Sequence, residues 1–326
     1  GNGTLNIQDG GVVNSLGTGI GGSSGSTGAA TVSGGGSQWN NNANDLAIGS
    51  DGNGTLNVEA GGLVSNQVGW IGYTADGTGV VTVAGGGSQW NNSAELFVGR
   101  EGSGTLNVEA GGLVSNGSGY VGWGAGSTGV VTVTGGGSQW NNSGQLRVGD
   151  SGNGTLNIAA GAVVSNSNGY LGYENGTEAE VMVSGSGSQW NNSGNLFVGN
   201  SGSGTLNVVD GGLISNTSGR IGENSGSTGV TTVTGSGSRW NNSDSLYVGN
   251  SGVGTMHVQS GGLVSNIVGE IGRFSGSTGV ATVTGSGSQW NNSSGLFVGA
   301  DGTGTLNVEA GGVVSNTVGV IGTLAG

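Results

Sequence analysis

The stretch that decides the fold is "GTLNVEAGGLVSNQVGWIGYTADGTGVVTVAGGGSQWNNSAELFVGREGS", residues 54–103. It recurs along the chain, and its most constant letters, GSQWNN or once GSRWNN, place a tryptophan in every repeat. Successive tryptophans lie 51 residues apart at the first step and 50 at the others, with the extra residue between Asn40 and Asp45. A period of this length indicates a repeat architecture. The tryptophans are Trp39, Trp90, Trp140, Trp190, Trp240 and Trp290.

Each repeat splits into two similar halves of about 25 residues. The first half holds the short runs "TLNV", "LVSN" and "WIG", and the second holds "VVTV", "SQWNN" and "LFV". These runs alternate with a period of two and are too short for helices, and 81 glycines in 326 residues disfavour helix further. We predict an all-β fold, a parallel β-helix (β-solenoid) of about 13 coils of about 25 residues with three short strands per coil. No shift in composition interrupts the series, so we expect one domain over residues 1–326. The chain begins within a repeat, at "GNGTLN", so we expect it to be a fragment of a longer protein.

The alternation separates inward from outward side chains. Leu56 and Val58 are expected to point inward and Thr55 and Asn57 outward. Trp90 aligns with Val64 of the other half, so we expect the six tryptophans in the core, where large and aliphatic side chains alternate. GSQWNN is therefore read as a structural motif, with a binding role as the open alternative. The Asn pairs after each tryptophan, and Asn66 and its equivalents, are expected to mark a corner with stacked amides.

Composition excludes several classes of function. The net charge is −13 although only 7% of residues are charged, because there is no lysine and only five arginines. Nucleic-acid binding and binding to anionic lipid both need clustered basic residues, so we expect neither. The chain has no cysteine, so disulfides and thiolate metal sites are excluded. No apolar run approaches 18 residues, and we expect no direct membrane insertion by this segment.

One column of outward side chains has a composition that folding of the coils does not require. In coil order, the middle residue of the third strand is aromatic or arginine at most positions, and neighbours should lie about 4.8 Å apart. One interpretation is that stacked rings stabilise the sheet; the other is an exposed contact surface for a partner. Arg147 should stack on a neighbouring tyrosine. The hypothetical partner-binding residues are Trp70, Phe97, Tyr120, Arg147, Tyr170, Phe197, Arg220, Tyr247 and Phe297.

Charges in the same region suggest compensation along the columns. Glu270 lies one repeat from Arg220, and Arg273 lies one repeat from Glu223. Two strand spacings, about 10 Å, separate such residues, so we expect weak compensation within each column.

"GTLNVEAGGLVSN" followed by "TVTGSGSQWNNSGNLFVG" resembles the type V secretion / PEP-CTERM-associated repeat of bacterial autotransporter passenger regions. The resemblance covers essentially the whole chain. It implies a right-handed parallel β-helix displayed outside the cell, in agreement with the general preference for right-handed crossovers. It also implies roles in adhesion, autoaggregation and biofilm formation, and it offers no catalytic residues to carry over.

Residues that could carry chemistry are scattered. His257 is the only histidine and occupies an outward column of asparagines, so we interpret it as a surface substitution. Glu174, Glu178 and Glu180 form the densest acidic group, interpreted as a solvated turn, with a cation or partner site as the alternative. No Ser–His–Asp arrangement or paired-carboxylate spacing is evident. We therefore expect no enzyme and no cofactor, with loosely bound Ca²⁺ at acidic turns left open.

The sequence favours a non-enzymatic protein of the bacterial cell surface, an adhesin or self-associating passenger. Its expected partners are a second copy, bound laterally or end to end, or glycans and host surfaces. The alternative is a structural stalk or the subunit of an extracellular filament assembled end to end.

Overall fold

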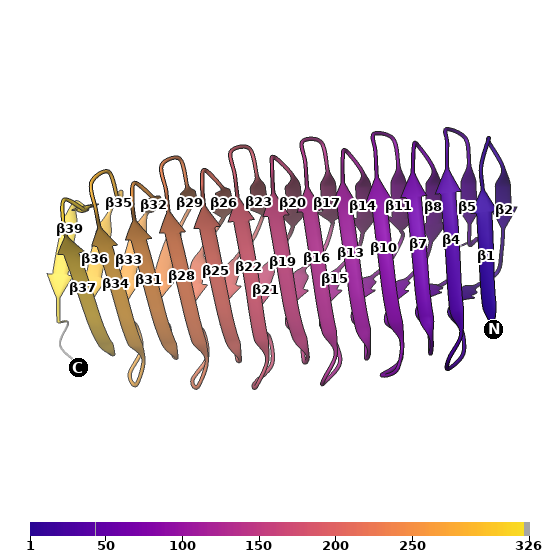
Figure 1. Ribbon diagram of the computed structural model, residues 1–326. Coiled ribbons are helices and arrows are strands. Elements are labelled where there is room, and N and C mark those ends of the chain that lie inside the picture. The colour runs from indigo at the N-terminus through magenta and orange to yellow at the C-terminus, as the bar shows by residue number, and fades with distance from the viewer. Residues whose placement is uncertain (43, 323–326) are drawn as a thin grey trace. The chain divides into compact units, whose positions relative to one another are not determined.

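The computed structural model describes residues 1–42 and 44–322, and its secondary structure there is entirely β (Figure 1). The strands form three parallel sheets of 13 strands each, and every coil contributes one strand to each sheet. The predicted β-solenoid of about 13 coils is therefore confirmed. Over the described ranges, no helix is present that is long and apolar enough to cross a membrane. The chain divides into two compact units, Gly1–Asn166 and Ser167–Gly326, and each is described by itself. The expected single domain stays a prediction.

In the first unit, three sheets follow one another around each coil (Figure 1). Sheet 1 consists of β1 (Asn2–Ile7), β4 (Thr27–Ser33), β7 (Asn53–Glu59), β10 (Thr78–Ala84), β13 (Ser103–Glu109), β16 (Thr128–Thr134) and β19 (Asn153–Ala159). Sheet 2 consists of β2 (Val12–Asn14), β5 (Gln38–Asn40), β8 (Leu63–Asn66), β11 (Gln89–Asn92), β14 (Leu113–Asn116), β17 (Gln139–Asn142) and β20 (Val163–Asn166). Sheet 3 consists of β3 (Thr18–Ile20), β6 (Leu46–Ile48), β9 (Gly69–Ile71), β12 (Leu96–Val98), β15 (Gly119–Val121) and β18 (Leu146–Val148).

The second unit repeats this arrangement. Its strands of sheet 1 are β22 (Glu178–Ser184), β25 (Ser203–Val209), β28 (Thr228–Thr234), β31 (Val253–Gln259), β34 (Thr278–Thr284) and β37 (Thr303–Glu309). Those of sheet 2 are β23 (Gln189–Asn192), β26 (Leu213–Asn216), β29 (Arg239–Asn242), β32 (Leu263–Asn266), β35 (Gln289–Asn292) and β38 (Val313–Ser315). Those of sheet 3 are β21 (Gly169–Leu171), β24 (Leu196–Val198), β27 (Gly219–Ile221), β30 (Ser245–Val248), β33 (Val268–Ile271), β36 (Gly295–Val298) and β39 (Val318–Ile321).

Neighbouring coils pair in register, so equivalent residues lie one above another. Leu56 pairs with Val81, and Trp90 pairs with Val64 on one side and Val114 on the other. The inward residues are fully buried; Leu56, Val58 and Trp90 each have 0% exposure. All six tryptophans of the motif are buried, with exposures of 0–2%. The period-two register read from the sequence therefore describes the core correctly.

Each letter of GSQWNN has a structural role in the repeat at Gly87–Asn92. Gly87 has φ +88°, a conformation that glycine adopts without strain. The buried Ser88 hydroxyl accepts from the Gly61 N–H at 3.0 Å and donates to the Ala84 carbonyl at 2.7 Å. Trp90 fills the core. On the outward side of the strand, the Asn91 side-chain amide donates a hydrogen bond to the Gln89 side-chain oxygen. This account supports the structural interpretation of the motif.

The tryptophan indole is tied to the neighbouring coil by a buried hydrogen bond. Trp90 Nε1 donates to Asn66 Oδ1 at 2.7 Å, and Asn66 Nδ2 donates to Asn92 Oδ1 at 2.7 Å. Asn92 Nδ2 then reaches the Ser115 carbonyl at 3.4 Å instead of the next side-chain amide. The asparagines thus form pairs within a repeat, not the continuous amide stack that the sequence suggested. The extra residue of the first repeat falls in the turn at Asn42 (φ 45°), beside Ala43, which lies outside the described residues.

Glycine has a second role that the sequence pattern did not predict, which is to let two sheets approach closely. Gly104 lies in β13 without a positive φ, yet a Cβ there would be 2.1 Å from the Gly99 nitrogen and 2.7 Å from the Ile71 carbonyl oxygen. Sheets 1 and 3 therefore approach so closely at this position that only a hydrogen atom fits between their backbones. Gly86, in contrast, has no heavy atom within 4 Å of an added Cβ and no positive φ.

The variant Gly104→Ala should lose about 1–3 kcal/mol of unfolding free energy, or more, because the added methyl group overlaps backbone atoms. Gly86→Ala is the matched control and should be neutral or stabilising by up to about 1 kcal/mol, since it restricts the unfolded chain. Urea denaturation followed by circular dichroism measures both. Similar stabilities for the two variants would contradict the close approach of the sheets.

Trp140→Ala should destabilise the chain by about 3–5 kcal/mol, because a large buried side chain is removed and Asn116 loses its indole donor. Trp123→Ala, a half-buried tryptophan of the preceding coil, serves as control and should cost clearly less. Unfolding midpoints in urea compare the two variants. Equal losses would show that the core position has no special role.

Candidate functional site

Aromatic side chains outside the core gather on one face. The chain has 8 Trp, 5 Tyr and 4 Phe. Apart from the six core tryptophans, each of them lies on an outward position of sheet 3 or in the turn that follows its strands. We call this surface the aromatic face. Strand alternation explains its orientation, since Leu96 and Val98 on either side of Phe97 are fully buried.

In the first unit, three rings stack along the aromatic face. Trp70 and Phe97 have centroids 4.5 Å apart with planes at 15°, and Phe97 and Tyr120 have centroids 4.7 Å apart with planes at 10°. The Arg147 guanidinium continues this column, 5.6 Å from the Tyr120 ring, as the sequence predicted. In-register pairing of β9, β12, β15 and β18 places these side chains next to one another.

In the second unit, the equivalent column of sheet 3 contains more charged residues than in the first unit. Tyr170 and Phe197 stack with centroids 4.7 Å apart and planes at 3°. Arg220 follows, with its guanidinium carbon 5.5 Å from the ring centroids of both Phe197 and Tyr247. A guanidinium between two rings at this distance makes cation–π contacts on both sides. Phe297 lies in the same column on β36.

A second column, not recognised in the sequence, lies beside the first. It consists of the residue directly after the glycine that ends each strand of sheet 3, three positions beyond the first column. Tyr73 packs edge-on against Trp70 at 5.4 Å, Trp123 against Phe97 at 5.7 Å, and Tyr173 against Tyr170 at 5.3 Å. The signal in the sequence is the aromatic or arginine residue that follows the glycine at Tyr73, Arg100 and Trp123.

This second column corrects the predicted exposure of the rings. The sequence suggested a ribbon of exposed aromatics, but Phe97 is only 9% exposed, and Trp70, Tyr120, Tyr170 and Phe197 are half-buried. Side chains after the glycine turn pack against the first column and cover part of each ring. Phe274, in the turn after β33, is in contrast 44% exposed. Whether the nine proposed residues bind a partner stays a prediction.

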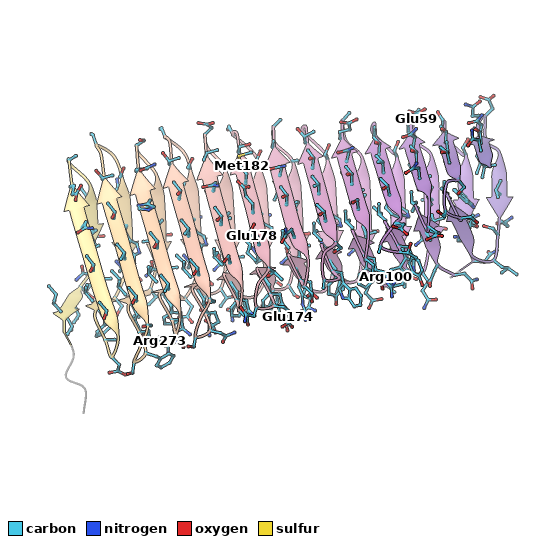
Figure 2. All side chains as sticks on the ribbon, turned by 60° about the horizontal axis from the view of Figure 1, so that its bottom comes forward. Glu59, Arg100, Glu174, Glu178, Met182 and Arg273 are labelled. Carbon is cyan, nitrogen blue, oxygen red and sulfur yellow. The ribbon has the colours of Figure 1, made fainter. Side chains whose placement is uncertain are left out.

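Arg100 lies at the centre of the cluster in the first unit. Its guanidinium carbon is 4.8 Å from the Trp70 ring, 4.5 Å from Tyr73 and 5.3 Å from Trp123. It also forms an ion pair with Glu101 at 2.7 Å. Figure 2 labels Arg100 on the edge of the coils, among the side chains of this turn region. A cation held by three rings and a carboxylate fixes the geometry of this surface.

Ion pairs link the two columns and correct a second expectation. Arg147 bonds to Asp150 at 2.8 Å, Arg220 to Glu223 at 2.7 Å, and Arg273 to Glu270 at 3.2 Å. Each pair joins residues i and i+3 across the glycine turn. Compensation therefore occurs mainly within a coil, not between repeats along one column, because three residues across the turn bring the charges into direct contact.

The acidic group of the second unit lies in a turn and on the strand that follows it, and its role as a cation or partner site stays a prediction. Glu174, Glu178 and Glu180 are exposed, and Figure 2 shows Glu178 on β22 with Met182, and Glu174 in the preceding turn. Within residues 1–42 and 44–322, no group of three or more His, Asp or Glu side chains is placed to hold a metal ion. His257 lies on β31, paired with Thr232 and Thr282, as a half-buried outward residue.

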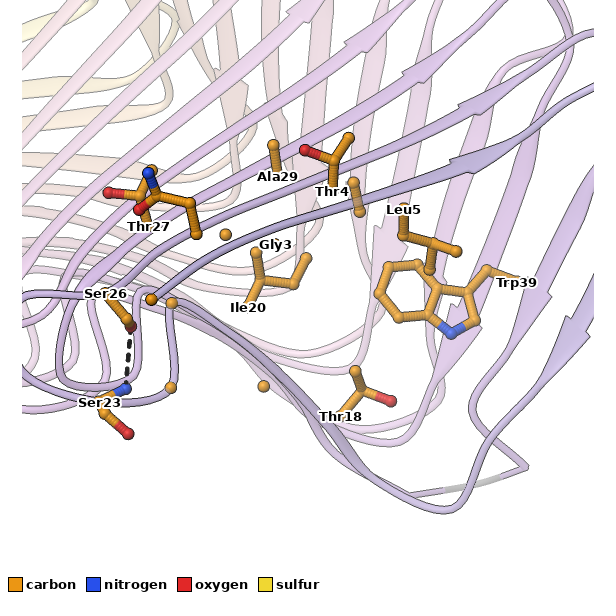
Figure 3. Close-up of a pocket in the computed structure, with 17 residues that line it drawn as sticks. Gly3, Thr4, Leu5, Thr18, Ile20, Ser23, Ser26, Thr27, Ala29 and Trp39 are labelled. Atoms are coloured by element: carbon orange, nitrogen blue, oxygen red, sulfur yellow. Dashed lines mark hydrogen bonds between the residues drawn. The ribbon is translucent and has the colours of Figure 1, made fainter.

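A hollow of about 520 Å³ opens at the first coil (Figure 3). Its wall includes Leu5, Ile20 and Trp39, and the Ser23 N–H bonds to the Ser26 hydroxyl at 3.1 Å on its rim. The equivalent positions belong to the core in later coils. We therefore interpret the hollow as part of the core and not as a ligand site.

The comparisons with known proteins identify no family. No protein-family model matches the chain, and none of the curated proteins matches it either. Among solved structures, it is similar to the TibC-catalysed hyper-glycosylated TibA 55–350 fragment, with a TM-score of 0.38 and 18% identity, covering 98% of this chain and 100% of that chain. A likeness at this level carries no argument about function. The family resemblance of the repeat stays a prediction.

Glu270 provides a test of the electrostatics of the aromatic face. Burial raises its pKa above the ordinary value of 4.5, which the Arg273 guanidinium opposes and the Asp301 carboxylate reinforces. A carboxyl group with a raised folded pKa gives a stabilising contribution that is full below its unfolded pKa and is lost as the pH rises through the folded pKa.

Glu270→Gln keeps a neutral group at all pH values. The variant should match the native chain below about pH 4.5 and become relatively more stable above the folded pKa, because no buried charge forms. Thermal unfolding across this pH range measures the difference. Glu59→Gln controls for the loss of one negative charge at an exposed site. A variant that becomes less stable than the native chain as the pH rises would show that the Arg273 ion pair outweighs burial.

Proposed function

We propose that the chain is part of a non-enzymatic, extracellular bacterial surface protein that acts in adhesion through contact with a second copy. The observation that carries the proposal is the aromatic face, where all aromatic residues outside the core are gathered. A core of this kind needs no rings on its outside, and clustered aromatic and arginine side chains are typical of contact surfaces. The family resemblance of the repeat supports the same role.

The chemistry of the face suits self-association. Half-buried rings are held rigid by stacking and by ion-paired arginines, so little side-chain entropy would be lost on contact. Acidic and basic groups alternate along it, which allows a second copy to pair opposite charges despite the net charge of −13. Lateral contact between copies on neighbouring cells would produce aggregation and biofilm. Glycans or host surfaces are alternative partners, since aromatic rings also stack on sugars.

A structural stalk or filament subunit is the second candidate. It is favoured by the burial of Phe97 and by the Arg147–Asp150 ion pair, in which both charges find their partner within one coil. In this reading, the rings stabilise the sheet, with a few tenths to about one kcal/mol for each cross-strand pair.

The test uses cells that display the chain. The variant with Trp70, Tyr120, Tyr170 and Phe197 changed to serine should reduce clumping to the level of cells without the protein, because the contact rings are gone. The matched control changes four outward residues of sheet 1 to serine, namely Asn57, Asn107, Asn157 and Asn207, and should clump normally. Settling of the cell suspension measures both.

Circular dichroism of the purified variants verifies that they fold. Normal clumping by a folded ring variant would refute adhesion through this face and favour the stalk. If the ring variant unfolds, soluble native chain added to displaying cells decides the question. It should compete and prevent clumping, and clumping that persists at excess soluble chain would refute self-association.

A further inference from the structure

The outward side of sheet 1 in the first unit carries a two-column array of β-branched and amide side chains. On β7, β10, β13, β16 and β19, one column holds Thr55, Val80, Thr105, Val130 and Thr155. The other holds Asn57, Thr82, Asn107, Thr132 and Asn157. We call these ten residues the threonine–asparagine array. In-register pairing spaces them about 4.8 Å apart across the strands and about 6.6 Å along each strand.

The polar groups of the array are not bonded to the protein. Among the residues described in the first unit, the side-chain hydroxyl and amide groups of the array make no hydrogen bond to another protein group. The outward side of sheet 2 differs, because Ser115 donates to Asn91 at 2.8 Å and Ser165 donates to Asn141 at 3.0 Å. Two polar faces of similar composition thus differ in whether their hydrogen-bonding capacity is used. The array presents its donors and acceptors outward at fixed intervals.

The array is also rigid and uncharged. Threonine and valine have one strongly restricted χ1 torsion, so their methyl and hydroxyl groups are held in place before any ligand binds. None of the ten residues is charged although the chain carries −13, and the nearest carboxylates in sequence, Glu59 and Glu109, lie at the ends of β7 and β13. In the second unit, Glu180, Met182 and His257 occupy the same columns and interrupt the pattern.

We propose that the threonine–asparagine array binds the surface of ice. Ice is a neutral, periodic lattice of hydrogen-bond donors and acceptors, and it excludes ions. A protein surface that binds ice must therefore be uncharged and regularly spaced, and its polar side chains must not be hydrogen-bonded to one another. Hydroxyl and amide groups can anchor waters of the first layer, and methyl groups between them order the adjoining water. A preorganised face loses little entropy on binding.

Other partners fit this array less well. A stacking surface for crystalline polysaccharide needs aromatic rings, and the array has none. A second copy docked on the array would cover roughly 300 Å², from ten residues spaced about 4.8 Å by 6.6 Å, which is below the about 800 Å² per partner of a standard interface. The proposal is independent of the adhesive role of the aromatic face, since it concerns a different sheet.

The experiment measures partition of the full chain into slowly grown ice. Native protein should be several-fold enriched in the ice fraction over an inert globular protein of similar size. Thr105→Lys places a flexible charge at the centre of the array and should abolish the enrichment. Thr105→Val retains the methyl groups and follows the pattern of Val80 and Val130, so enrichment should persist.

The matched control is Ser115→Lys, an outward substitution on β14 of the same coil, which should partition as the native chain does. Melting curves verify that each variant folds. Exclusion of the native chain from ice, or equal losses for Thr105→Lys and Ser115→Lys, would overturn the proposal. Capture by crystalline cellulose that depends on Thr105, without partition into ice, would overturn it in favour of a polysaccharide surface.

Discussion

The buried hydrogen bond between a tryptophan indole and an asparagine amide determines how the coils fit together. The core is slender, and each coil contributes few side chains to it, so a tryptophan in every second coil supplies much of its volume. A buried indole N–H without an acceptor would be costly. Asn66 accepts that bond from Trp90 and donates to Asn92, so the large ring is placed with its polar atom satisfied. The ring also lies over Gly69, where an added Cβ would be 2.9 Å from it.

The aromatic face depends on that core indirectly. Because the coils pair in register, any outward side chain meets its equivalents in the neighbouring coils, and rings at one position stack without further adjustment. The glycine turn then brings a second set of side chains against the first. At Arg147, Arg220 and Arg273, ion pairs with carboxylates three residues away link the two columns. Sheets 1 and 2 carry mainly short polar side chains, so the three outward surfaces differ in chemistry although they share one backbone pattern.

The sequence predicted much of this structure, and the failures have physical causes. Period-two alternation identified the strands, the inward residues and the burial of Trp90, because each coil repeats the same pattern over a regular sheet. The alternation stops at Gly72, whose φ of +68° turns the chain, so the packing of Tyr73 on Trp70 could not be read from it. Gly104 was likewise missed, since nothing local shows that another sheet approaches there. The pairing of the asparagine side chains could not be predicted either, because it depends on an indole N–H that occupies one of the amide oxygens.

The pairing of Trp90 with Asn66 explains why the period is 50 residues and not 25. The indole and its acceptor belong to adjacent coils of one repeat, whereas the bond from Asn92 to the next repeat, at 3.4 Å, is the weaker link. A gene that gains or loses a whole repeat by recombination keeps each indole opposite its acceptor, which is Asn66 for Trp90 and Ser15 for Trp39. A half-repeat exchange would set two indoles against each other. The length of such a protein can therefore evolve freely, but only in steps of two coils.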